Sequence, residues 1–450
     1  MHYTNFSFVL IFWIFFVGIK DAFTRFKNRS SNATPSWPDQ LTWIVTNNLT
    51  TSSSMTTNLL KEKLQSFTAT NSQNIKDDEN EYSKIAFLQY TSGSTSEPKG
   101  VMITHLNLSH NLTIITRELK ADESTKVVSW LPQYHDMGLI GSYLGIIYCG
   151  GSGYYMSPLT FLQRPILWME AISKYKGTHI QAPNFAYRLT ARKFRKDALQ
   201  ELLDLSSLVH MINAAEPIDK ASLDYFCHVF EPFGLNPKTM FPTYGLAEHT
   251  VFVCSGGRQI LKVKKQELET ERTVILIHKN NDENLDENLD ENRISTIVGC
   301  GYPSNQNIDV RIVDDQSMME VGENQVGEIW VHSLSKAGGY FQKERESQET
   351  FYAKLSNTND DKTYLRTGDL GFIYEKELFI CGRSKDLIIV GGRNHYPQDI
   401  ESSAEEVSSN IRPGCTAAFS VNPIDKGDEK VALLLELRET PKAKVSEAKI

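Results

Sequence analysis

The sequence predicts an α/β sandwich around a largely parallel sheet. Short β-like runs, among them 85–90, 126–131 and 209–213, alternate with stretches of helical period such as 161–174 and 220–233. Such alternation is typical of strand–helix–strand units whose helices cover both faces of one sheet.

Further along the chain, the pattern changes twice. Residues 298–330 hold β-rich runs broken by Gly, Pro and Asp, which predicts a small antiparallel or barrel-like unit. A new α+β pattern begins after a break that includes residues 382–385. We therefore expect an apolar segment at 1–29, a large domain at 30–381, and a small α+β domain at 386–450.

Composition excludes several classes of protein. The 450 residues are 40% hydrophobic and carry a net charge of −8, without a basic cluster interleaved with aromatic residues. These values are typical of a globular protein of two or three domains that does not bind nucleic acid. The six cysteines include no Cys-x-x-Cys pair, which favours a reducing, cytoplasmic location.

The N-terminal segment differs from this pattern. Residues 6–19 are almost continuously apolar, and four basic residues follow by position 29. The run is shorter than a transmembrane helix, which needs about 20 apolar residues. It also lacks the features of a cleaved signal peptide. Two interpretations stay open: a membrane anchor with the rest of the chain in the cytoplasm, or a start that carries no function.

The strongest motif is a loop rich in small hydroxyl residues. Tyr90-Thr-Ser-Gly-Ser-Thr-Ser-Glu-Pro-Lys99-Gly100 directly follows the strand-like run 85–89. Small residues let backbone N–H groups converge on an anion, and a lysine adds a point charge for polyphosphate. Lys99 precedes its glycine, so this is not a Walker loop, and linkers rarely follow a buried strand. The phosphate ligands we predict are Thr91, Ser92, Gly93, Ser94, Thr95 and Lys99.

Further motifs follow in a fixed order. Together with the loop they resemble the adenylate-forming superfamily of acyl-CoA synthetases, luciferases and peptide-synthetase adenylation domains. The resemblance implies the adenylate-forming fold, with a small, mobile C-terminal domain. The motifs are Trp130-Leu-Pro-Gln-Tyr-His-Asp-Met-Gly-Leu-Ile, Asn213-Ala-Ala-Glu-Pro, Tyr244-Gly-Leu-Ala-Glu, Tyr364-Leu-Arg-Thr-Gly-Asp and Gly382-Arg-Ser-Lys-Asp.

The resemblance implies a nucleotide site for ATP. Ala215 and Glu216 would lie at the end of the strand that binds adenine, and Tyr244 with Gly245 would pack on the adenine ring. Asp369 would bind the ribose hydroxyls.

It also implies a metal, a hinge and an acyl pocket. Glu248 would hold Mg²⁺, whose preferred ligands are oxygens. Arg383 would contact phosphate or ribose, and Lys385 belongs to the hinge at 382–385. The acyl pocket would be lined by Trp130, His135, Met137 and Gly138.

Each of these residues also has a structural interpretation. His135 is a candidate catalytic residue, but alone it is more often structural. Because His135 and Asp136 are adjacent, we expect their side chains to face different ways and not to form a dyad. Glu248 alone is typical of a surface carboxylate, and Asp369 of a turn. Arg383 equally suits a structural ion pair.

Within the superfamily the chain looks most like the fatty acyl-AMP ligases, which pass the acyl group to an acyl carrier protein. The shared wording is Phe87-Leu-Gln-Tyr, Val298-Gly-Cys-Gly, Gly327-Glu-Ile-Trp and Gly392-Arg-Asn-His-Tyr-Pro-Gln-Asp-Ile-Glu. Fifty residues separate Glu248 from Gly299, a long spacer. The resemblance implies that this insertion, at 256–297 with an acidic loop, restrains the small domain from the thioester-forming position.

The chain departs from the family pattern in places. Ser96 and Ala214 replace usual glycines, which restricts residues that need φ > 0. Much of the first subdomain is absent before the loop, and neither Lys442 nor Lys444 matches the family's late catalytic lysine. We therefore expect a chain truncated at both ends, with the catalytic lysine not identified.

The predicted function is ATP-dependent activation of a fatty acid to its acyl-adenylate, with transfer to an acyl carrier protein in lipid or polyketide biosynthesis. Two alternatives stay open. Coenzyme A is the acceptor in the first, which makes the protein a long-chain fatty acid–CoA ligase. In the second the chain is an impaired nucleotide- or acyl-binding pseudoenzyme, or a fragment.

Overall fold

The computed structural model describes residues 83–91, 98–195, 203–277, 293–358, 361–390, 393–408, 410–421 and 430–438. Several predictions lie outside these residues: the apolar segment, Ser92 to Ser96, the acidic loop at 280–292, Lys442 and Lys444. The chain divides into two compact units, 1–87 and 88–450. Among the residues described, no helix has both the length and the apolar character that crossing a bilayer requires.

A six-stranded sheet forms the centre of the second unit. Its first five strands pair in parallel, and the last pairs antiparallel at one edge. The prediction of a largely parallel α/β sheet is confirmed. In spatial order the strands are β4 (Ser152–Tyr155), β3 (Lys126–Ser129), β5 (His179–Ala182), β6 (His210–Asn213), β7 (Met240–Tyr244) and β8 (Cys254–Ser255).

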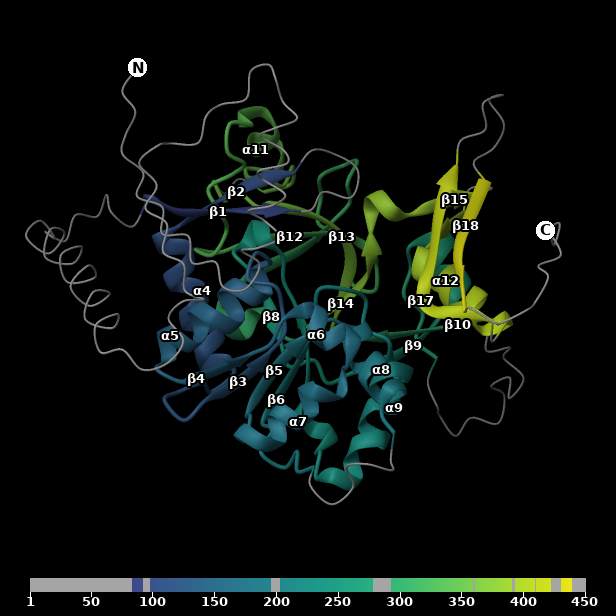
Figure 1. Ribbon diagram of the computed structural model, residues 1–450. Helices are drawn as coiled ribbons and strands as arrows, with labels where there is room; N and C mark the ends of the chain where they lie inside the picture. Colours follow the sequence, from purple (N-terminus) through teal and green to yellow (C-terminus); the bar gives the residue numbers. More distant parts are fainter. Residues whose placement is uncertain are drawn as a thin grey trace, which may run out of the picture. The chain divides into compact units, whose positions relative to one another are not determined.

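Helices are grouped around this sheet (Figure 1). The first begins at a capping box, in which Thr104 and Asn107 satisfy each other's backbone N–H groups. The α-helices are α4 (His105–Glu118), α5 (Gly145–Cys149), α6 (Pro158–Gln163), α7 (Ile166–Tyr175), α8 (Asn184–Lys193) and α9 (Lys220–Phe230), with a π-helix η2 (Met137–Leu144) between β3 and α5.

Two predicted helical stretches are shorter in the structure. The stretch 161–174 contains a break at Arg164, whose φ of −141° and ψ of 77° lie outside the helical region. Pro165 causes this break, because a proline disfavours the α conformation in the residue before it. The stretch 220–233 ends as a 3₁₀ turn, η4 (Glu231–Phe233).

A second, antiparallel sheet follows, as predicted for 298–330, but it extends to residue 383. It is an open sheet of four consecutive strands around a buried core that includes Trp330 and Tyr364. The strands are β11 (Asp309–Val313), β12 (Gly327–His332), β13 (Leu365–Tyr374) and β14 (Glu377–Arg383).

Shorter elements precede, separate or follow the strands of the two large sheets. They are β1 (Ile85–Thr91), β2 (Lys99–Thr104), η5 (Pro237–Thr239), η6 (Ala247–His249), β9 (Ile260–Lys264), α10 (Lys265–Glu271), β10 (Ile294–Val298), η8 (Pro303–Gln306), α11 (Glu344–Phe351) and η9 (Ser384–Asp386). The α+β pattern predicted after residue 386 is present as β15 (Ile388–Val390), β16 (Arg393–His395), α12 (Pro397–Val407), β17 (Ile411–Val421) and β18 (Lys430–Leu437).

Candidate active site

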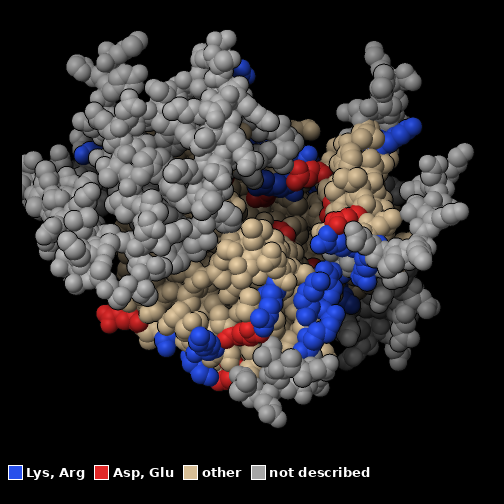
Figure 2. Space-filling view, viewed as in Figure 1, with Lys and Arg blue, Asp and Glu red and all other residues tan. Residues whose placement is uncertain are grey.

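A cleft of about 1680 Å³ collects most of the predicted site residues that the structure describes. Figure 2 shows the hollow with acidic and basic side chains gathered around it. Such a position beyond the ends of parallel strands is usual for ligand sites in α/β folds. The predicted residues that line it are Thr91, Lys99, His135, Met137, Ala215, Glu216, Tyr244, Gly245, Glu248, Asp369, Arg383 and Lys385.

A buried carboxylate connects the two sheets in this cleft. The Tyr244 hydroxyl donates to Asp369 Oδ2 at 2.6 Å, and Arg383 Nε donates to Oδ1 at 2.9 Å. Burial raises the pKa of Asp369, and the cation of Arg383 opposes that rise. The carboxylate is a hydrogen-bond acceptor of the kind that ribose hydroxyls need.

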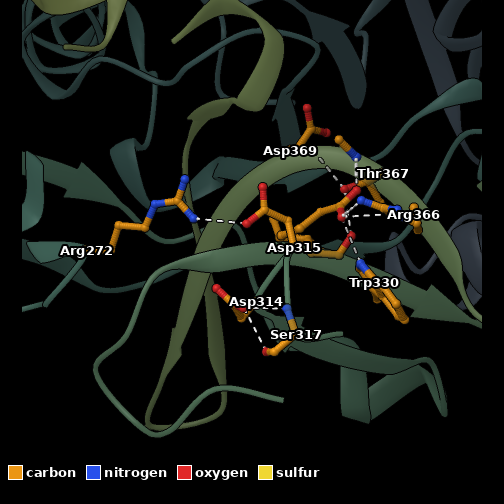
Figure 3. Close-up of polar contacts among 11 residues, drawn as sticks. Arg272, Asp314, Asp315, Ser317, Trp330, Arg366, Thr367 and Asp369 are labelled. Carbon is orange, nitrogen blue, oxygen red and sulfur yellow. Dashed lines mark hydrogen bonds and ion pairs between the residues drawn. The ribbon is translucent and has the colours of Figure 1, made fainter. Parts of the chain in front are cut away.

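Strand β13 holds Asp369 through a network around the buried Glu328. Figure 3 shows Arg366, Thr367, Asp369 and Trp330 in this region. Glu328 accepts from Arg366 Nη2 at 2.8 Å and from Trp330 Nε1 at 3.0 Å, and its other oxygen accepts from the N–H of Gly368 at 3.1 Å. The Asp369 N–H donates to Thr367 Oγ1 at 3.0 Å. The turn that presents Asp369 is therefore fixed on both sides.

Lys99 and Glu248 both contact Tyr340. Lys99 Nζ is 4.6 Å from the centre of the Tyr340 ring and 2.5 Å from Glu346 Oε2. The Tyr340 hydroxyl donates to Glu248 Oε1 at 2.9 Å. Burial raises the pKa of Glu248, and a cation bound beside it would lower that pKa again.

The donor set fits magnesium bound together with nucleotide. In the part of the chain that the structure describes, no group of three or more His, Cys, Asp or Glu side chains gathers at a metal site. Mg²⁺ typically takes one or two carboxylates and completes its shell with phosphate oxygens and water. Glu248, a partly buried carboxylate in the same cleft as Lys99, suits that arrangement.

Backbone geometry explains why position 245 is a glycine. It also shows that the positive φ expected at residue 214 belongs to residue 215. A Cβ on Gly245 would lie 1.7 Å from the carbonyl oxygen of Val251, so only glycine fits there. The sequence pointed to Ala214 as the position that lacks a glycine, but the residue with positive φ is Ala215, at 73°. Glu216 next to it accepts from the N–H of Phe185.

The expectation for His135 and Asp136 was wrong. Their side chains meet, with His135 Nδ1 2.8 Å from Asp136 Oδ1. Alternation of side chains applies to regular strands, whereas these residues lie in the turn that leads into η2. The contact with Asp136 raises the pKa of His135.

Trp130 and Gly138 are absent from the cleft lining. Trp130 is buried and stacks on Phe161, with ring centres 4.0 Å apart. A Cβ on Gly138 would lie 2.0 Å from the carbonyl oxygen of Pro132. Both residues therefore shape the segment that carries His135 and Met137.

The predicted insertion contacts the C-terminal elements. Lys265 Nζ lies 3.3 Å from Asp399, and Asn394 Nδ2 donates to the carbonyl of Glu269 at 2.9 Å. Leu268 belongs to the same buried cluster as Tyr396. The sequence motifs did not include Tyr340 or Glu346, and they included Glu328 only as part of Gly327-Glu-Ile-Trp, without a role. The contacts of these residues are with partners distant in sequence.

The two sheets and a cleft lined by Lys99, Glu248 and Asp369 define the fold of an adenylate-forming enzyme. The chain belongs to the family of AMP-binding enzymes, whose model matches residues 38–341.

The relatives that the chain matches include fatty acid ligases. It is 38% identical over 360 residues to the medium-chain fatty acid–acyl carrier protein ligase JamA of Moorena producens, over 79% of this chain and 58% of that protein. It is 38% identical over 372 residues to the long-chain fatty acid–AMP ligase FadD32 of Mycolicibacterium smegmatis, over 79% and 57%. The chain thus spans less than two thirds of these relatives.

Solved structures agree with the sequence relatives. The crystal structure of a fatty acid AMP ligase from Legionella pneumophila matches with a TM-score of 0.63 at 39% identity, over 80% of this chain and 60% of that one. A second structure from that organism, a fatty acyl-adenylate ligase in complex with acyl adenylate and pyrophosphate, matches equally well. These matches confirm the predicted fold.

Proposed function

We propose that this protein activates a fatty acid with ATP, forming the acyl-adenylate and releasing pyrophosphate, and passes the acyl group to an acyl carrier protein. The observation that carries the proposal is the single cleft that holds Lys99, Glu248 and Asp369. The similarity to fatty acid ligases supports the choice of substrate.

In this reaction a carboxylate oxygen attacks the α-phosphorus of ATP as the bond to the pyrophosphate oxygen breaks. The protein contributes position and charge. Asp369 accepts from the ribose hydroxyls, Tyr244 lies against adenine, and Lys99 pairs with the β- and γ-phosphates. Mg²⁺, when bound, would neutralise phosphate charge, and Glu248 would hold it.

The insertion supports the choice of a carrier protein as the acceptor. Contacts of Lys265 and Asn394 hold the insertion against the C-terminal elements, which favours the adenylate-forming arrangement over one that admits coenzyme A. The relative JamA is an acyl carrier protein ligase. Coenzyme A stays the alternative acceptor.

We place the protein in the cytoplasm, because all six cysteines are free thiols, as expected in a reducing compartment. Association with a membrane through residues 6–19 stays a prediction, since those residues lie outside the described part of the chain.

Pyrophosphate exchange tests the proposal. The protein is mixed with ATP, Mg²⁺, a fatty acid and labelled pyrophosphate, and label in ATP reports reversible adenylation. Exchange that requires the fatty acid supports the proposal. Background exchange by folded protein that binds ATP contradicts it and favours the pseudoenzyme. Parallel reactions with carrier protein and with coenzyme A identify the acceptor.

A further inference from the structure

A small cavity lies behind one wall of the cleft. Its volume is about 30 Å³, and most of its lining is apolar, including Val127, Ile146 and Ile180. Burial of hydrocarbon against such apolar side chains is favourable. Five residues line both the cavity and the cleft, so the two spaces share a wall: Ile115, Leu119, Gly141, Gln181 and Ile212.

Gln181 is the polar member of that shared wall. It belongs to β5 and its amide nitrogen donates to the carbonyl of Met137 at 3.0 Å and to the hydroxyl of Ser142. Both acceptors belong to η2, in which hydrogen bonds run from residue i to i+5 and turns are widened. The side chain is therefore fixed across the gap between strand and π-helix.

Gly141 makes room for this amide. A Cβ on Gly141 would lie 2.6 Å from Gln181 Oε1 and 2.9 Å from Nε2. The glutamine side chain thus fills the space that any other residue at position 141 would need. No local sequence motif indicates this contact between a strand and a helix 40 positions apart.

We propose that Gln181 ends the acyl pocket and that the cavity behind it is an extension of that pocket which the Gln181 side chain blocks. The inference rests on the proposed function, because the occupant is the methyl end of the fatty acyl chain that His135 and Met137 lead toward. The Gln181 side chain fills the space between the cleft and the cavity, so an acyl chain that reaches it cannot extend further. Removing the amide joins the cavity to the cleft and admits longer chains.

The test compares Gln181→Ala and Gln181→Ser with Gln181→Leu, which retains a side chain of similar length at the wall. Pyrophosphate exchange is measured with saturated fatty acids from eight to sixteen carbons. For the two small residues, kcat/KM for longer chains should rise relative to shorter ones by about fourfold for each added methylene that enters the cavity. Gln181→Leu should keep the profile of the unaltered protein.

The outcomes separate the two proposals. If every variant and the unaltered protein lack exchange with every fatty acid, the proposed function fails. If exchange occurs but folded Gln181→Ala or Gln181→Ser keeps the original chain-length profile, the function stands and the role of Gln181 is refuted. A shift in Gln181→Leu equal to that in Gln181→Ala also refutes it, because a wall of similar length would then not matter.

Discussion

Lys99 is already paired with Glu346. The ammonium lies 2.5 Å from the carboxylate, and Glu346 comes from α11, far from the loop in sequence. The ion pair lowers the pKa of Glu346, so the carboxylate is charged at neutral pH. We therefore expect polyphosphate, the proposed ligand of Lys99, to compete with Glu346 for the ammonium group.

Glu346→Gln should lower the KM for ATP. The side chain of Glu346 is 38% exposed, so the pair contributes only about 0–1 kcal/mol, equivalent to at most about a fivefold change. The KM is measured by exchange at low and high salt, and the difference should shrink as salt screens the pair. Glu349→Gln is the control, since Glu349 pairs with Arg345 on the same helix. An unchanged or higher KM in Glu346→Gln contradicts the competition.

Asp369→Asn should raise the KM for ATP. Hydrogen bonds to a charged group contribute about 1.5–3 kcal/mol, which corresponds to an increase of about ten- to 150-fold. The control is Asp309→Asn, an aspartate of the same sheet that pairs with Arg311 and Lys362 outside the cleft lining. Direct binding of ATP, measured by calorimetry, should weaken in the first variant only. If the two variants weaken ATP binding equally, Asp369 has a structural role and does not bind ATP.

The sequence predicted the elements of the fold better than the contacts between them. The parallel sheet followed from alternating runs, because strand and helix periods are local properties. The sequence analysis predicted one helical stretch where the structure has α6 and α7. It missed the break between them, although Pro165 is a local signal for that break. Motifs located Asp369 and Glu248.

Several contacts of the site could not be predicted, because they depend on how the chain packs and not on a local motif. The approach of Glu346 to Lys99 and of Gln181 to Gly141 depends on tertiary packing. The meeting of His135 with Asp136 depends on a turn whose dihedral angles have no sequence signature here. Packing between distant elements is what the local patterns leave open.

The free energy of unfolding should decrease as the pH falls below about 6.5. Burial lowers the pKa of His249 to about 4, and of His210 to about 4. Unfolded chains bind protons at the ordinary histidine pKa of about 6.5, so the unfolded state holds more protons between pH 6.5 and 4. Stability is therefore complete above pH 6.5 and is lost toward pH 4, with a slope of about 1.4 kcal/mol per pH unit for each histidine.

His249→Gln tests the assignment. In the native chain His249 contacts the carbonyl of Phe252 at 2.7 Å and the hydroxyl of Ser333 at 2.7 Å. The variant should be less stable at pH 7. The slope of its free energy of unfolding against pH, between pH 6.5 and 4, should be smaller by about 1.4 kcal/mol per pH unit, the contribution of one proton. Urea unfolding at several pH values measures both quantities. An unchanged slope would show that the pKa of His249 is not lowered in the folded protein.

Loosening the insertion should raise activity with coenzyme A. Lys265→Ala and Asn394→Ala each remove a contact between α10 and the C-terminal elements, at Asp399 and at the Glu269 carbonyl. Each contact is worth about 1 kcal/mol or less, so acyl-CoA formation should rise up to about fivefold in each variant while adenylate formation stays unchanged. Lys264→Ala is the matched control, because Lys264 lies beside Lys265 but pairs only weakly with Glu267 of the same insertion, at 3.7 Å. The product is quantified by mass spectrometry from reactions with ATP, fatty acid and coenzyme A. If Lys264→Ala and Lys265→Ala behave alike, the contact with Asp399 does not restrain the C-terminal elements.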